Sequence, residues 1–367
     1  MYISSSSIDR IKDIPVADVI GRYIELKKNG SGFKANSPFN DEKSPSFFVH
    51  PGKNIFKCFS SGKGGDAIAF VMEFNNMTYI DAIKDIAQKC GERLEYEEQT
   101  PEVKEQADHR ELLYKLNEAT ARQYTKQLHE LLNKRAGDLE LKHPAIDEIV
   151  KRKFTYDTLV QWQIGYAPQP EKWDFLTSLI GDKNYNQAIE LGLIKSKEQT
   201  GKRYDAWRNR VMFPIHNHHG RIVAFGGRAM APDQYNPKYM NSSDSKIFSK
   251  ENTLFGLHFA TRIIQTAGYA NLMEGYTDVI SFHQAGFSNS VGTCGTALSD
   301  AQCKLLKKYC SKVVLFPDPD KAGEASALRN IDILMKHGFE TAVVPMPQVE
   351  GKKVDPDELT RMFSLTA

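Results

Sequence analysis

The apolar positions of this chain follow different periods in different stretches. Residues 8–22 show a short helical pattern that Pro15 interrupts, and residues 66–90 show a longer one. Between residues 23 and 63, short apolar runs alternate with glycine and proline, which is typical of short strands and turns. A long helical pattern then runs from Leu112 to Leu132. The pattern predicts a small sheet packed on helices, followed by a long core helix.

The stretch from Tyr269 to Asp357 alternates short apolar runs with helical patterns, which predicts βαβ units and a parallel sheet. One apolar run ends at Glu274 and another at Asp318 and Asp320. The ligand site of such a sheet lies beyond the carboxyl ends of its strands. We therefore expect these carboxylates to converge at one edge of the sheet.

These strand-end carboxylates are candidates for a metal site. Residues i and i+2 of an extended segment point the same way, so Asp318 and Asp320 can face a common point. Crowded carboxylates raise one another's pKa, and a hard divalent cation such as Mg²⁺ removes that conflict. Acidic residues at strand ends are often ordinary loop residues, but their order along this chain favours the metal site. The candidate ligands are Glu274, Asp278, Asp318, Asp320, Asp355 and Asp357.

A β-hairpin predicted between residues 204 and 228 ends in two glycines and Arg228, and Lys238 and Lys250 follow in short turns. Glycine lets a backbone approach a phosphate closely. Arginine offers a planar fork of donors to phosphate oxygens, and lysine offers a point charge. Scattered surface charge explains most other basic residues but explains these three poorly, so they are candidates for phosphate binding.

Basic and aromatic residues interleave between residues 23 and 63, although the net charge of the whole chain is only +2. Such a segment can follow a phosphate backbone and stack bases. The alternative is that the phenylalanines form the core of a small sheet and the lysines solvate its outside. We expect most of the phenylalanines to be core, with one or two facing single-stranded nucleic acid. The candidate contacts are Lys34, Lys43, Lys57 and Lys63.

Several of these motifs carry a resemblance to a known family. Residues 269–357 resemble a Toprim domain, the fold shared by bacterial primases, topoisomerases and some nucleases. Residues 37–70 resemble the N-terminal zinc ribbon of bacterial DnaG-type primases. Residues 151–154, 163–168 and 204–256 resemble the catalytic core of the same family. The resemblance runs from Ser7 to about Met362.

The resemblance implies a multidomain fold of the α+β and α/β classes. It predicts a zinc-ribbon-like, template-binding domain at residues 1–95 and a linker at 96–111. The N-terminal subdomain of the catalytic core follows at 112–260, and a Toprim domain with a parallel sheet at 261–367. A helicase-binding domain, which the family usually carries, is expected to be missing, and the chain resembles a shortened member.

The activity implied is DNA-primase activity, the synthesis of short RNA primers on single-stranded DNA by metal-dependent nucleotidyl transfer. Glu274, Asp318 and Asp320 would be catalytic, with Mg²⁺ or Mn²⁺ as the cofactor. Template, ribonucleoside triphosphates and RNA primer would be the partners, and a replicative helicase is expected for the family. Two alternatives are another Toprim enzyme, such as a nuclease or topoisomerase, and a non-catalytic template-binding relative. The residues that match the family's nucleotide-handling and template-handling positions are Arg152, Arg228, Lys238, Asn241 and Lys250.

The four zinc-ligand positions of the family fall on Ser37, Asn40, Cys58 and Ser61. Zinc prefers thiolate or imidazole ligands, and one cysteine does not make a structural site. The expectation is therefore a ribbon without zinc. The five cysteines form no Cys-x-x-Cys pair, and no apolar run is long enough to span a membrane. Both features favour a cytoplasmic protein with reduced thiols.

Overall fold

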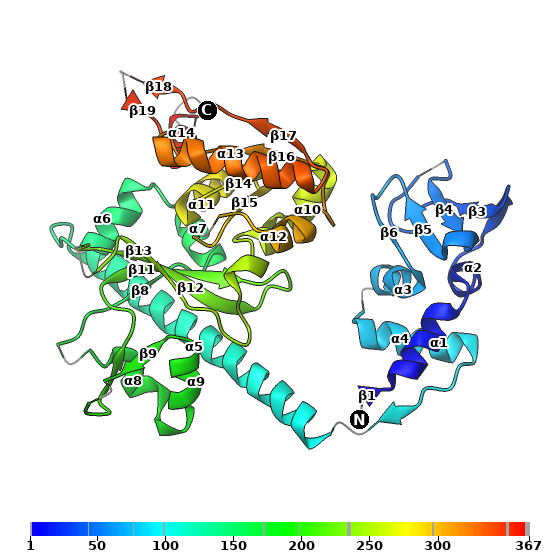
Figure 1. The fold of residues 1–367 in the computed structure, drawn as a ribbon, viewed down its shortest axis with the longest axis horizontal. Coiled ribbons are helices and arrows are strands. Elements are labelled where there is room, and N and C mark those ends of the chain that lie inside the picture. The colour runs from blue at the N-terminus through cyan, green and yellow to red at the C-terminus, as the bar shows by residue number, and fades with distance from the viewer. Residues whose placement is uncertain are drawn as a thin grey trace. The chain divides into compact units, whose positions relative to one another are not determined.

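The structure is a computed structural model that describes residues 2–42, 44–75, 77–97, 100–171, 173–197, 199–232, 236–295, 297–349 and 352–363. The chain divides into two compact units, Met1–Gln106 and Ala107–Ala367, shown as ribbons in Figure 1. Each unit is described by itself. The multidomain α/β class expected from the sequence is confirmed.

The first unit is built on a five-stranded antiparallel sheet in the order β2-β3-β4-β5-β6. Its strands are β2 (Lys27–Asn29), β3 (Gly32–Ala35), β4 (Phe47–His50), β5 (Ile55–Cys58) and β6 (Gly64–Gly65). Pro15 separates the first two helices, as the sequence predicts. The unit also contains α1 (Ser5–Asp13), α2 (Val16–Ile20), η1 (Pro51–Lys53), α3 (Ala67–Asn75), α4 (Tyr79–Cys90), and the paired β1 (Tyr2–Ile3) and β7 (Tyr96–Glu97).

Phe70 in α3 lies at the centre of the first unit's core. It is fully buried, and its ring contacts those of Phe47 and Phe56 at centroid distances of 5.7 and 5.6 Å. Strand residues alternate faces, so Phe47 and Phe56 point into the core while Phe48 and Lys57 lie on the other face. Most phenylalanines of this segment are therefore core, as expected.

The long helix α5 (Pro101–Gly137) begins earlier than predicted. Residues 101–111, expected to be part of a linker, are helical. Proline suits the first turn of a helix, and the Thr100 hydroxyl accepts a 3.4 Å hydrogen bond from the backbone N–H of Val103. Glu102 in the first turn also suits the positive end of the helix. The acidic composition of this stretch favoured a linker, so these signals for the start of a helix were overlooked.

The second unit contains an antiparallel sheet in the order β13-β12-β11-β8. Its strands are β8 (Gly165–Ala167), β11 (Arg210–His216), β12 (Ile222–Ala229) and β13 (Tyr239–Asn241). The predicted hairpin is the pair β11–β12. Around this sheet lie α6 (Pro144–Lys151), α7 (Tyr156–Gln161), α8 (Phe175–Ile180), η2 (Asp182–Asn184), α9 (Tyr185–Glu190), β9 (Ile194–Ser196), β10 (Arg203–Asp205) and η3 (Lys250–Asn252).

A second, fully parallel sheet has the order β15-β14-β16-β17, as the βαβ pattern predicts. Its strands are β14 (Tyr269–Met273), β15 (Ser290–Gly292), β16 (Lys312–Leu315) and β17 (Glu340–Val343). In Figure 1 the orange helix α13 runs along this sheet. The other elements are α10 (Leu257–Ala267), α11 (Tyr276–Gln284), α12 (Asp300–Leu306), α13 (Lys321–Lys336), β18 (Gln348–Val349), β19 (Lys352–Lys353) and α14 (Pro356–Phe363).

The two glycines before Arg228 explain how the two sheets of the second unit pack. A Cβ at Gly226 would lie 2.3 Å from the ring of Tyr276, and one at Gly227 would lie 2.7 Å from the ring of Trp207. Aromatic rings therefore fill the space that the missing side chains leave. These glycines were expected to let the backbone approach a phosphate; in the structure, aromatic rings pack against them. None of the described helices is long and apolar enough to cross a membrane.

Candidate active site

The candidate active site lies at the carboxyl edge of the parallel sheet. Glu274 directly follows β14, and Asp318 follows its neighbour β16. Burial and the nearby carboxylates Glu274, Asp320 and Asp355 raise the pKa of Asp318 to about 6. The structure thus brings the predicted strand-end carboxylates within electrostatic reach of one another. We call Glu274, Asp318, Asp320 and Asp355 the acidic edge.

Asp320 has a second task at the start of α13. One of its carboxylate oxygens accepts a 2.7 Å hydrogen bond from the backbone N–H of Gly323, which caps the helix. A Cβ at Gly323 would lie 2.3 Å from the carbonyl oxygen of Asp318, so the turn is too tight for a larger residue. The cap and the glycine together fix the backbone that carries both aspartates.

Asp278 and Asp357 form a buried pair beside the acidic edge. Burial and the charges of Asp318, Asp357 and Asp355 raise the pKa of Asp278 to about 7, while Arg152 opposes the shift. Asp278 also accepts a 3.2 Å hydrogen bond from the backbone N–H of Asp357. The Asp357 side chain is only 1% exposed, and Arg152, Arg361 and Ser281 surround it at 2.5, 3.0 and 2.5 Å. The Asp357 carboxylate is thus already engaged in ion pairs and a hydrogen bond with other side chains.

Arg152 and Arg228, the two arginines predicted to handle nucleotide or template, share a carboxylate that was not predicted from the sequence. Glu148 in α6 lies 2.6 Å from Arg152 and 2.8 Å from Arg228. Arg152 then reaches Asp357 with a second nitrogen, so its position is set by two ion pairs. Glu148 and Arg152 are an acidic and a basic residue four positions apart, and this spacing is the sequence signal that could have revealed Glu148.

The remaining predicted basic and amide residues have different surroundings. The charge of Lys238 opposes the upward pKa shift of Asp318, which places this ammonium near the acidic edge. Asn241 uses both ends of its amide: it donates to the Cys294 carbonyl oxygen and accepts from the Tyr276 hydroxyl, each at 2.8 Å. Lys250 opens η3, and its carbonyl oxygen accepts a 2.9 Å bond from Gln302. Asn241 therefore holds the two sheets together.

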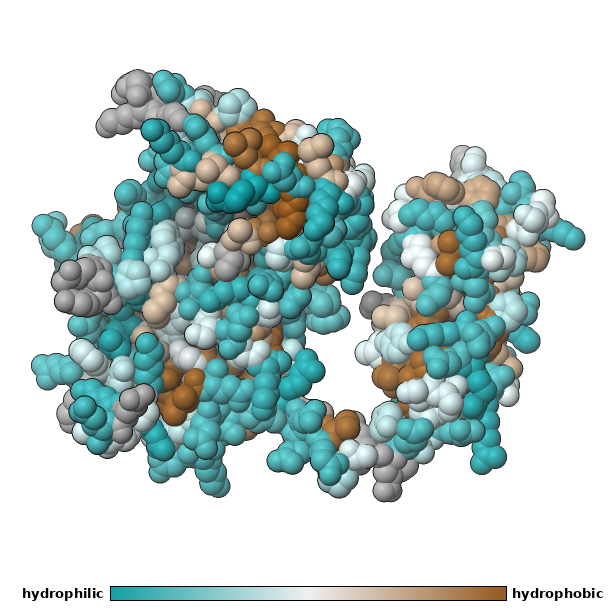
Figure 2. Space-filling model, in the orientation of Figure 1, coloured by the Kyte–Doolittle hydropathy of each residue, from teal (hydrophilic) through white to brown (hydrophobic). Residues whose placement is uncertain are grey.

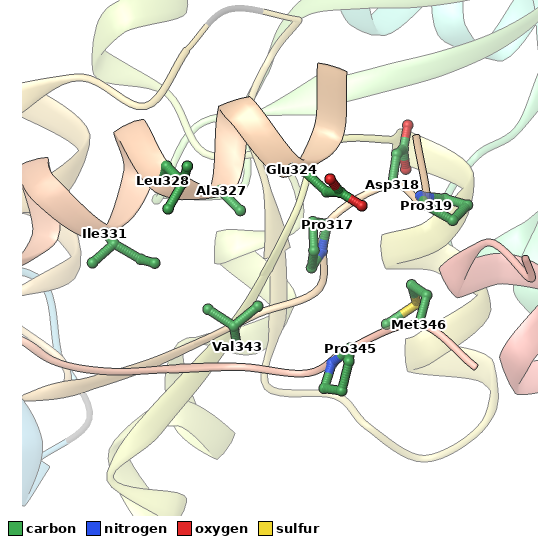
Figure 3. Close-up of a pocket in the computed structure, with 10 residues that line it drawn as sticks. All are labelled: Pro317, Asp318, Pro319, Glu324, Ala327, Leu328, Ile331, Val343, Pro345 and Met346. Atoms are coloured by element: carbon green, nitrogen blue, oxygen red, sulfur yellow. The ribbon is translucent and has the colours of Figure 1, made fainter. Parts of the chain in front are cut away.

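A groove of about 410 Å³ opens beside Asp318. Figure 3 shows Ala327 and Leu328 of α13 on one side of it and Val343 on the other, with Asp318 and Pro319 at one end. Brown apolar side chains gather on this part of the surface in Figure 2. Leu328 is 66% exposed and Val343 is 41% exposed. The acidic edge is thus flanked by an apolar wall.

The first unit presents a row of side chains across its sheet. Lys34 pairs with Phe48, and Phe48 pairs in turn with Lys57. Phe59 is 68% exposed, and its ring meets Phe48 edge-on at 5.6 Å. We call Lys34, Phe48, Lys57 and Phe59 the ribbon row. Basic and aromatic groups side by side are what stacking on single strands requires.

The other two predicted lysines of this unit do not join the ribbon row. Lys63 is held by Glu73 at 2.6 Å and lies over the ring of Phe39. Lys43 lies outside the described residues. Within the part of the chain that the structure describes, no three histidine, cysteine, aspartate or glutamate side chains gather tightly enough to enclose a metal ion unaided.

Comparison with known families agrees with this architecture. Three family models match in chain order: a CHC2 zinc finger at residues 3–102, the N-terminal domain of a DNA primase catalytic core at 131–261, and a Toprim-like domain at 271–360. A chain with these three domains in this order belongs to a class of multidomain nucleic-acid enzymes that contain a Toprim-like domain. The chain belongs to the family of bacterial DnaG-type DNA primases.

The relatives and solved structures are similar over most of this chain. DNA primases of Halalkalibacterium halodurans and Aquifex aeolicus are each 36% identical, over 98% of this chain and over 58% and 67% of their own lengths. The chain thus spans less than two thirds of the first relative. The crystal structure of the Aquifex aeolicus primase, with its zinc-binding and RNA polymerase domains, matches with a TM-score of 0.60 at 32% identity, over 98% of this chain and 83% of that one.

The expectation of a ribbon without zinc is wrong. The first unit matches the CHC2 zinc finger model over residues 3–102, and that match implies zinc binding in this domain. The structure does show one suitable ligand: Cys58 is buried, and although burial opposes the shift, hydrogen bonds with Ser37, Ser60 and Ser61 lower the pKa of Cys58 to about 7. A lowered pKa favours the thiolate that zinc prefers. The expectation rested only on the side chains at the four aligned ligand positions and did not consider the rest of the domain.

Proposed function

We propose that this chain is a DNA-directed RNA polymerase that synthesises short RNA primers on single-stranded DNA during replication. The observation that carries the proposal is the acidic edge with Lys238 near Asp318, in a chain of the bacterial primase family. The reaction transfers a ribonucleotide from its triphosphate to a 3′-hydroxyl group and releases pyrophosphate. The proposed domain roles are template binding by residues 1–95 and catalysis by residues 112–260 together with the Toprim domain at 261–367.

The side chains of the acidic edge fit Mg²⁺ or Mn²⁺. All of them offer oxygen ligands. Burial, and after it the charges of the neighbouring carboxylates, raise the pKa of Asp318, and a bound cation would offset that repulsion. Magnesium commonly takes one or two carboxylates and completes its shell with water and substrate phosphates. Glu274, Asp318 and Asp320 would hold the metal, with Asp355 next to them. Bound metal would stabilise charge on the attacking and leaving oxygens.

The cations around the edge have distinct proposed roles. Lys238 would balance the triphosphate charge beside Asp318, and Arg228 would hold a phosphate with the ends of its guanidinium fork. Lys250 would contact template or nucleotide. Arg152 would act mainly through its ion pair with Asp357, which is buried with Asp278 behind the metal ligands. Asn241 would act through its contacts with Cys294 and Tyr276.

Template binding is proposed for the ribbon row. A related catalytic domain has been solved bound to single-stranded DNA, at 29% identity and a TM-score of 0.59, over 70% of this chain and 78% of that one, which supports template binding by the catalytic core. Ribonucleoside triphosphates and the RNA primer are the other proposed partners, and the family implies a replicative helicase. All five cysteines are described and are free thiols, which supports a proposed location in the reducing cytoplasm.

The test is incorporation of labelled ribonucleotides in the presence of Mg²⁺, with and without single-stranded DNA. The proposal expects short, alkali-labile products whose sequence follows the template. A protein that binds the template but incorporates no ribonucleotide under these conditions would be a template-binding relative. Cleavage of the DNA without synthesis would identify a nuclease instead.

A further inference from the structure

Glu148 in α6 is a buried carboxylate that contacts two arginines through the same oxygen atom. Its Oε1 lies 2.6 Å from Nε of Arg152, one turn along the same helix, and 2.8 Å from Nε of Arg228 in β12. Its side chain is 9% exposed. Burial alone would raise the pKa of Glu148, but the hydrogen bond from Arg152 and the charges of both arginines lower it below its ordinary value. Glu148 is therefore an ionised group between two cations.

The two arginines differ in what their other nitrogens do. Arg152 uses Nη1 for the 2.5 Å ion pair with Asp357, so it is held at both sides of its fork. Arg228 has a weaker contact at that end, a 3.3 Å hydrogen bond from Nη1 to the Tyr239 hydroxyl. Arginine carries five N–H donors, and Nε supplies only one of them. The contact of Arg228 Nε with Glu148 is an ion pair without hydrogen-bond geometry, and the Arg228 side chain is 14% exposed. Glu148 thus holds Arg228 at Nε by charge, while the ends of the fork keep donors for a ligand.

We propose that Glu148 is a positioning residue for Arg228, which it aims at a phosphate group of the bound ribonucleotide. The inference rests on the proposed primase activity and adds a residue to it. An arginine side chain has several rotatable bonds, and the ion pair at Nε restricts that freedom before the ligand arrives. The carboxylate also offsets one of the two positive charges that it contacts.

The test compares Glu148→Gln with wild type. Glutamine keeps the shape and a carbonyl acceptor but loses the charge that holds both arginines. The expected result is a fall in kcat on the order of tenfold to a hundredfold, the range for a misplaced catalytic contact. The dissociation constant for the single-stranded template should stay the same or fall, because both arginines remain charged. A merely structural role would reduce rate and binding together, in proportion to the fraction of folded protein.

Two further variants sharpen the comparison. Glu148→Asp keeps the charge on a shorter arm and should recover part of the lost kcat. Glu118→Gln is the matched control, since Glu118 also pairs with an arginine, Arg221, at 2.7 Å but at a more exposed place. The control should leave kcat unchanged. Circular dichroism of each variant gives the folded fraction to which every rate is referred.

A double-mutant cycle shows whether Glu148 acts through Arg228. If it does, Glu148→Gln should cause no further loss of kcat in an Arg228→Ala background. Equal losses in both backgrounds, or an unchanged kcat in the single variant, would overturn the proposal. If Glu148→Gln does not fold, Glu148→Asp replaces it in the cycle with the same expectation. A wild-type protein without primer synthesis would instead contradict the proposed function, so the two failures are distinguishable.

Discussion

Arg152, the C-cap of α6, and Asp357 in α14 form a 2.5 Å ion pair although they lie 205 positions apart in the chain. From the sequence, Arg152 was expected to handle nucleotide or template, and Asp357 to bind metal. In the structure they neutralise each other beside Asp278 and close the end of the Toprim domain onto α6. The pair explains why both types of residue can lie near a metal site without contacting a ligand directly.

Replacing Arg152 by alanine should destabilise the protein strongly. The change leaves Asp357 and Glu148 buried with fewer partners, and breaking a buried ion pair typically costs about 3–5 kcal/mol. The measurement is the free energy of unfolding in urea. Arg221→Ala is the control, because Arg221 pairs with Glu111 and Glu118 at a more exposed site and should cost about 1 kcal/mol or less. Equal losses in the two variants would contradict the structural role of Arg152.

Replacing Lys238 or Arg228 by alanine should weaken nucleotide or template binding and change its response to salt. Each phosphate contact releases counterions, so the slope of log affinity against log salt should fall by roughly one unit per lost contact. The measurement is a salt titration of template binding by fluorescence anisotropy. Lys312→Ala, which removes a lysine paired with Glu340, should leave the slope unchanged. If slope and nucleotide affinity both stay at wild-type values, neither Lys238 nor Arg228 contacts a phosphate.

Magnesium should stabilise the protein more at high pH than at low pH. The pKa of Asp318 rises from 3.8 to about 6 in the folded protein, so the folded state holds this proton more tightly than the unfolded state. Ionisation of Asp318 therefore lowers stability as pH rises between these two values, and a bound cation reverses that loss. The rise in melting temperature on adding Mg²⁺ should be larger at about pH 8 than at about pH 5. Equal rises at both pH values, or an undiminished rise in Asp318→Asn, would contradict the metal assignment.

Phe59 should matter for template binding and Phe70 for folding. Phe59 is 68% exposed, so Phe59→Ala should leave the melting temperature unchanged but weaken binding by about 1–3 kcal/mol if a base stacks on it. Phe70 is fully buried among aromatic rings, and Phe70→Ala should cost about 3–5 kcal/mol of stability. Wild-type template affinity in Phe59→Ala would remove the ribbon row from the proposed interface.

The alternation of apolar runs and helical patterns was enough to predict the parallel sheet. It also predicted that Glu274 and Asp318 lie at the same edge of the sheet, because strand direction fixes where the carboxyl ends lie. The hairpin of β11 and β12 and the capping box at Ser299 were predictable for the same reason, since their signals are local.

Partnerships between distant residues could not be predicted in this way. No local sequence pattern indicates that the Asn241 amide hydrogen-bonds Cys294 and Tyr276, or that the ring of Tyr276 packs against Gly226. Such contacts depend on how two sheets pack, which periodicity does not encode. The expectation of a domain without zinc failed for a different reason, because the metal content of the whole domain was inferred from four aligned side chains.

The most direct test of the account is primer synthesis on single-stranded DNA by wild type and by Asp318→Asn at saturating Mg²⁺. Asparagine removes the charge at the centre of the acidic edge, and Asp332→Asn, an exposed change on α13, is the control. The account predicts template-dependent primers from wild type and from the control. Asp318→Asn should fold normally but lose more activity than the roughly 10–100-fold that loss of an outer contact to a metal ligand costs. Near-normal synthesis by Asp318→Asn would contradict the central claim.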